Sequence, residues 1–67
     1  MLTKDSKNEY DLDGLMHQMM LMRAINRPCL TDVMVAPVGT AWEGTKPNGS
    51  KWQITKMGQN CCELEIN

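Results

Sequence analysis

Apolar side chains between residues 10 and 26 recur at the spacing of an amphipathic α-helix. On a helix that turns about 100° per residue, one stripe roughly 120° wide contains Leu12, Leu15, Met16, Met19 and Met22. Asp11 or Asp13 would lie near the start, where a carboxylate meets free N–H groups. Pro28 disfavours helical geometry at Arg27. We therefore expect an N-terminal helix at about 11–26, with its apolar stripe packed on the rest of the chain.

From residue 30 onward the apolar positions follow a period of two, interrupted by turn-forming residues, which is typical of short β-strands. We expect strands at about 33–36, 40–43, 51–57 and 61–66. Trp52 shares the phase of Ile54, so we expect it to be structural and more buried than Trp42. Short connections indicate antiparallel neighbours. The predicted fold class is α+β, with the helix on a three- or four-stranded antiparallel meander, either a sheet or a small SH3-like barrel.

The organisation predicted from these patterns is a flexible polar lead at 1–9 and a single small α+β domain at 10–67. A domain of 67 residues buries only about 60% of the surface of its unfolded chain. The chain has seven Met and no Phe, so its core is filled largely by flexible side chains. Both features favour association with another chain.

The predicted helix carries apolar residues on more than its core stripe. The other side of the helical wheel contains Tyr10, His17, Leu21, Ala24 and Ile25, and Met20 lies between the two groups. A helix that is apolar on two sides is normally buried on two sides, and one small sheet covers only one of them. We therefore predict that these six residues bind a partner, in part by self-association of the helix into a homodimer. The alternatives are a sheet that wraps further round, or isolated exposed apolar residues at Leu21 and Ile25.

The net charge and the polar first residues of the sequence favour a cytoplasmic protein. The formal net charge is −1, which disfavours a protein whose main role is to hold a nucleic-acid backbone. The first residues lack the apolar run of a secretion signal, and no apolar stretch is long enough to span a bilayer. Three cysteines, an odd number, fit reduced thiols better than a disulfide framework.

The candidate metal ligands do not form a recognisable site, so we expect no metal and no other cofactor. A structural zinc site usually has paired ligands two to four residues apart, but Cys61 and Cys62 are adjacent and would point to opposite faces of a strand. Met16 and His17 are about 100° apart on a helix and do not converge on copper. Asp11 and Asp13 lack the further oxygen ligands of a calcium loop.

Catalysis requires convergent groups on a scaffold. A single histidine, a surface cysteine and scattered acids do not provide them. We therefore expect no catalytic residues and no enzymatic activity.

A second hypothesis is a small barrel that binds single-stranded nucleic acid. Aromatic rings interleaved with lysines can hold such a strand by base stacking and phosphate contacts. The residues available for this are Trp42, Lys46, Lys51, Trp52 and Lys56. The nearby Glu43, Glu63 and Glu65 and the core phase of Trp52 weigh against it.

The favoured hypothesis is a small non-catalytic module that binds another, unidentified protein. It would act as an inhibitor, an adaptor or a regulatory subunit by occupying a site on something larger. The hypothesis includes an accessory protein of a phage or mobile element, because small proteins of that kind often act in this way.

Overall fold

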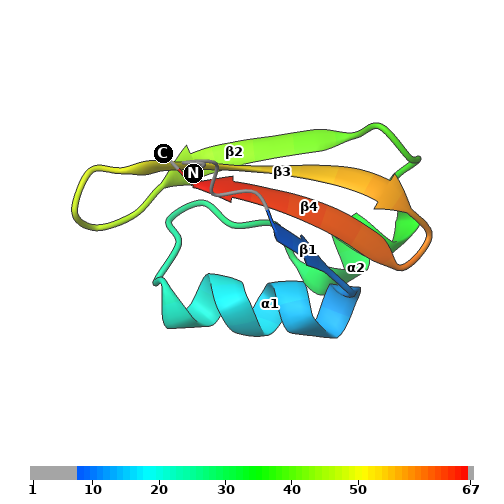
Figure 1. Cartoon of the computed structure of the whole chain (residues 1–67), viewed down its shortest axis with the longest axis horizontal. Coiled ribbons are helices and arrows are strands. Elements are labelled where there is room, and N and C mark those ends of the chain that lie inside the picture. Colours follow the sequence, from blue (N-terminus) through cyan, green and yellow to red (C-terminus); the bar gives the residue numbers. More distant parts are fainter. Residues whose placement is uncertain (1–7, 67) are drawn as a thin grey trace, which may run out of the picture.

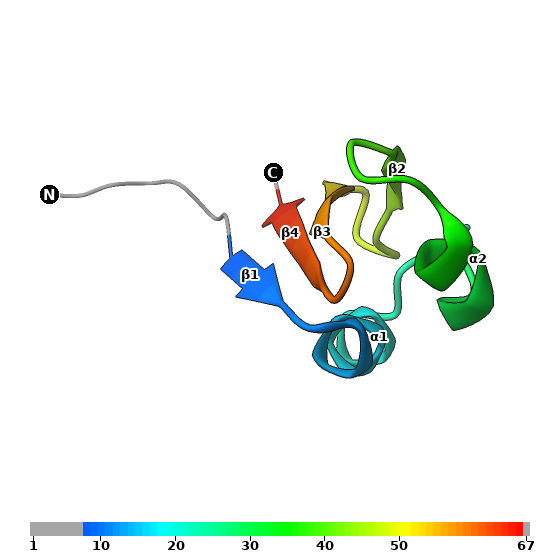
Figure 2. The same ribbon diagram turned by 90° about the vertical axis from the view of Figure 1, so that its right-hand side faces the viewer.

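The computed structural model describes residues 8–66, which form a four-stranded antiparallel sheet and two helices (Figure 1). In chain order the elements are β1 (Asn8–Tyr10), α1 (Leu12–Leu21), α2 (Leu30–Val35), β2 (Ala41–Thr45), β3 (Lys51–Gly58) and β4 (Cys61–Ile66). Figure 2 shows both helices on the same side of the sheet. The α+β class is thus confirmed.

The sheet is open and has the order β1-β4-β3-β2, so that β1 and β2 are its edges. The predicted SH3-like barrel is therefore not formed by the described residues. The last three strands make the expected meander, close to the bounds predicted from the alternating pattern. The loop between β2 and β3 contains Gly49 at a positive φ of 94°, which glycine adopts readily because it has no Cβ.

The start of α1 follows the sequence, whereas its end does not. Asp11 caps the helix by accepting a hydrogen bond of 2.7 Å from the backbone N–H of Gly14. At the other end Arg23 adopts a left-handed φ of 55° and donates to Met20 O, while Ala24 N donates to Met19 O. These are the two hydrogen bonds of a Schellman motif. The helix therefore ends at Leu21, and the predicted extension to about residue 26 is wrong.

The predicted strand at 33–36 is also wrong, because these residues lie in and just after helix α2. Asp32 is in the first turn, where a carboxylate interacts favourably with the helix dipole. Val33 is fully buried. The sheet obtains its fourth strand from β1 instead, which pairs with β4 and places Tyr10 opposite Cys62. Residues 8 and 9 thus belong to the sheet, and the remainder of the predicted flexible lead, residues 1–7, lies outside the described residues.

One core lies between the helices and the inner face of the sheet. Its buried apolar residues are Leu12, Leu15, Met19, Met22, Val33, Trp52, Ile54, Cys62 and Leu64. The predicted core stripe of α1 is thus confirmed, with Met16 packed at its margin. The other face of the sheet carries no helix (Figure 1). Neither helix within residues 8–66 has the length and apolar character needed to cross a membrane.

Candidate functional site

Three large apolar side chains are exposed at the C-terminal end of α1 and in the segment that follows it. Met20 is 60% exposed, Leu21 is 64% exposed and Ile25 is 44% exposed. Met20 and Leu21 lie on the side of α1 that faces away from the buried Met19 and Met22. We call these three residues the α1 surface. A large apolar side chain in water forgoes the free energy that its burial would contribute.

The Schellman motif fixes the backbone beneath the α1 surface. After the left-handed Arg23, the chain turns back to the sheet, where Ile25 N donates to Thr45 O over 2.8 Å. Thr45 O also accepts from the indole Nε1 of Trp52 over 3.1 Å. A Cβ at Gly44 would collide with the Trp52 ring and with the Ile25 carbonyl oxygen. The glycine therefore permits the close approach that holds Ile25 beside β2.

The six residues predicted to bind a partner do not form one continuous helical face. Tyr10 belongs to β1 and Ala24 follows the helix cap, and both pack against the core as partly buried residues. His17 is exposed on α1. The helical wheel assumes an unbroken helix, and the chain leaves the helix before Ala24. Met20, Leu21 and Ile25 are the large apolar members of the set that remain exposed.

Lys56 has a structural position at the opposite end of the molecule. Its side chain extends from the inner face of β3 and is only 3% exposed. The ammonium Nζ donates to three carbonyl oxygens at the end of α2, those of Val33 (2.8 Å), Met34 (3.0 Å) and Ala36 (2.7 Å). The three donors of a lysine are thus satisfied, and a positive charge lies at the negative end of the helix dipole.

Two of the five residues of the nucleic-acid hypothesis are enclosed in the fold. Trp52 is 1% exposed, and the Lys56 ammonium is occupied by α2. The expectation that Trp52 is more buried than Trp42 is confirmed, because Trp42 is only partly buried. Lys51 is exposed and Lys46 is half-buried. Stacking and phosphate contact would therefore fall to Trp42, Lys46 and Lys51, which provide one partly covered ring and two cations.

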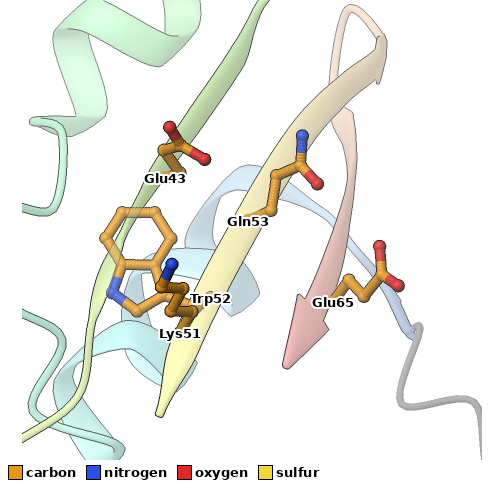
Figure 3. A pocket seen from close by; sticks show the side chains of 5 residues that line it. All are labelled: Glu43, Lys51, Trp52, Gln53 and Glu65. Carbon is orange, nitrogen blue, oxygen red and sulfur yellow. The ribbon is translucent and has the colours of Figure 1, made fainter. Parts of the chain in front are cut away.

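The uncovered face of the sheet is predominantly acidic. Alternation and strand register place Glu9, Glu43, Glu63 and Glu65 on it, with Lys51 as its basic residue. Figure 3 shows Glu43, Gln53 and Glu65 projecting from three neighbouring strands. A depression of about 170 Å³ lies among them, smaller than the roughly 300 Å³ of a small ligand site. This negative face repels phosphates.

The three cysteines have different environments. Cys29 is exposed, Cys61 is half-buried and Cys62 is buried. Burial raises the pKa of the Cys62 thiol, because removal from water disfavours the thiolate. The positive charge of Lys56 opposes this shift, and Cys61 adds to it. No three His, Cys, Asp or Glu residues within 8–66 are grouped so that they could hold a metal ion.

Sequence reasoning missed the structural role of Lys56, although one signal was present. Lys56 is in phase with Trp52 and Ile54, the inward-facing residues of the same strand. A lysine at an inward position indicates a buried charge that needs hydrogen-bond partners.

No protein-family model matches this chain, and neither a curated protein nor a solved structure matches it.

Proposed function

We propose that this chain is a small non-catalytic module that binds another protein, with the α1 surface as its docking surface. The supporting observation is that Met20, Leu21 and Ile25 are exposed on a backbone fixed by the helix cap and by the Ile25–Thr45 hydrogen bond. Apolar side chains on a rigid support can be buried by a partner with little loss of conformational entropy. Methionine adds adaptability, because its flexible side chain fits irregular surfaces.

The proposed function requires no catalytic pocket. Two shallow depressions, of about 170 Å³ and 220 Å³, occur at β2 and its neighbours. Both are smaller than the roughly 300 Å³ at which small-ligand pockets begin. The proposed roles are those of an inhibitor, an adaptor or a regulatory subunit, each of which acts by occupying a surface of a larger protein.

The simplest partner for the α1 surface is a second copy of the chain. In a two-fold dimer the same surface is used twice. Burying a Leu or an Ile contributes about 1.5–3 kcal/mol each, so Leu21 and Ile25 from both copies contribute enough for association at high protein concentration.

Light scattering of the purified chain over a concentration series tests this self-association. We expect the molar mass of the wild type to rise towards that of a dimer. The double variant Leu21→Glu/Ile25→Glu should remain a monomer, because it places a carboxylate at each contact position. The matched control is Gln59→Glu, which adds a charge at an exposed position in the turn between β3 and β4, away from the α1 surface, and should leave the dimer intact. A wild type that stays monomeric at millimolar concentration would exclude the homodimer.

A further inference from the structure

The outer edge of β2 has main-chain groups with no partner among residues 8–66. Lys56 N donates to Thr40 O and Lys46 N donates to Ser50 O, so the even-numbered residues of this segment hydrogen-bond towards β3. The main-chain N–H and C=O groups of the odd-numbered residues point away from β3, as the hydrogen bond from Ile25 N to Thr45 O shows. By this alternation the N–H and C=O groups of Ala41 and Glu43 point outward, and no described residue pairs with them.

Neighbouring segments define the length of this free edge. At one end Ile25 pairs with Thr45 and occupies the edge. At the other end Thr40 N donates to Pro37 O, so the chain turns away from the strand direction. The free edge is therefore the stretch from Ala41 to Glu43. Exposed strand edges accept an additional strand, because their unpaired groups form the same ladder that they would form within a sheet.

The two faces of the edge favour different side chains in an added strand. On the acidic outer face Glu43 lies beside Gln53, and Glu65 follows on the next strand. An outward-pointing Lys or Arg next to Glu43 would form an opposite-charge cross-strand pair. On the inner face Trp42 is partly buried and presents apolar surface. The edge therefore fits an extended segment in which cationic and apolar residues alternate.

A second copy of β2 fits this edge less well. If two β2 strands pair antiparallel with their centre at Glu43, the two Glu43 carboxylates lie directly opposite each other. If the centre is at Trp42, they are diagonal neighbours at about 7–8 Å. Both arrangements place like charges close together. Charge complementarity thus favours a positively charged segment of a different protein.

We infer that the free edge of β2 receives an extended, positively charged segment of a partner protein, which pairs with Ala41 and Glu43 as a fifth strand. The inference rests on the proposed function, in that the chain acts by binding a protein. The free edge from Ala41 to Glu43 is a separate surface that adjoins the α1 surface at Ile25, which pairs with Thr45. The edge binds by main-chain hydrogen bonds and charge, whereas the α1 surface binds by apolar burial.

The test uses a blocked synthetic peptide of sequence Lys-Val-Lys-Val-Lys-Val-Lys as the probe. Nuclear magnetic resonance of the full chain follows the backbone amides of Ala41 and Glu43 and their exchange with deuterium. We expect the peptide to shift both amide signals and to slow their exchange. The same peptide with Glu in place of Lys should not bind. A version that is N-methylated throughout keeps the charge but has no main-chain donors, and it should bind about tenfold or more weakly.

Variants of the chain separate the edge from the α1 surface. Glu43→Pro removes an N–H that points away from β3, so it blocks strand addition without loss of a sheet hydrogen bond, as proline on edge strands does. Glu43→Lys should reverse the preference between the two charged peptides. Leu21→Glu should leave peptide binding unchanged, so that a failure of the proposed function is distinguishable from a failure of the edge.

Three results would overturn the inference. One is the absence of amide shifts at millimolar Lys-Val peptide. Another is equal binding of the N-methylated peptide, which would show adhesion to the acidic face without strand pairing. The third is protection of the Glu43 amide in the free chain that increases with protein concentration, which would show that a second copy occupies the edge. The peptide arms use the wild-type chain, so they decide the question even if Glu43→Pro does not fold.

Discussion

Helices α1 and α2 lie on the same side of the sheet but are anchored differently. Helix α1 has ten residues, buries Leu12, Leu15 and Met19, and is capped at both ends by neighbouring residues. Helix α2 has six residues, buries only Val33 and has no side-chain cap at its start. Its last carbonyls are held by Lys56, which is 23 positions from Val33 in sequence. The first helix depends on apolar burial and local signals, and the second on one distant cation.

The two helices therefore have different structural roles. Because α1 is held by its sheet-facing side, Met20 and Leu21 can face solvent without loss of stability. Because α2 is held at its end, it can remain a short helix although its residues favour strands. In the proposed function α1 provides the binding surface, while α2 covers the core at Val33.

The largest expected effect separates the two sides of α1. Met19→Glu places a carboxylate in a site with no exposure. Burial of an unpaired charge costs more than the roughly 5 kcal/mol that stabilises a domain of this size. We therefore expect the variant to be unfolded, as measured by circular dichroism. The adjacent Met20→Glu, at an exposed position, should change the free energy of unfolding by less than about 0.5 kcal/mol. Equal effects would show that the assignment of the two sides is wrong.

The next largest effect comes from removing the hydrogen bonds that hold the end of α2 to Lys56. Lys56→Met removes the donor from three carbonyl oxygens, and we expect a loss of about 2–3 kcal/mol in urea unfolding. Amide exchange should accelerate in α2 more than in α1. Lys51→Met is the matched control, because Lys51 is exposed on the same strand. Identical results for the two variants would show that the hydrogen bonds of Lys56 do not stabilise α2.

A smaller effect concerns pH and the thiol beside Lys56. Burial raises the pKa of Cys62 in the folded chain. The folded state therefore keeps the neutral thiol at a pH where the unfolded state, with a pKa near 8.5, begins to ionise. The contribution of Cys62 to stability is fully present below that pH and is lost as the pH rises through the folded pKa. The stability difference between wild type and Cys62→Ala should thus decrease as the pH rises above the pKa of the unfolded thiol, about 8.5. A pH-independent difference would contradict it.

The strands were predictable because their signal is local. Trp52, Ile54, Cys62, Leu64 and Ile66 alternate with polar residues, and the same alternation sets the inner face of the sheet. The stripe of α1 was predictable for the same reason. Strand β1 was not, because a polar segment of three residues pairs with β4 only once the meander exists.

The remaining errors have specific physical causes. Arg23 ends α1 in a conformation that glycine usually provides, so the sequence has no visible stop signal there. The β-branched Val33 and Val35 favour a strand, whereas burial of Val33 and the three hydrogen bonds from Lys56 favour a helix. For the candidate site, the wheel places Leu21 opposite the core stripe and Met20 between the two groups, and both are exposed in the structure. It cannot place Tyr10 and Ala24, which lie outside the helix. Binding at these residues stays a prediction.

The most direct test of the proposed function is affinity capture from the native host, with quantitative mass spectrometry. Tagged wild type is compared with Leu21→Glu/Ile25→Glu, and circular dichroism verifies that both are folded. If the α1 surface is the docking surface, at least one host protein is recovered with the wild type and with the Gln59→Glu control, and is lost with the double variant. Equal recovery of the same protein by wild type and double variant would contradict the account.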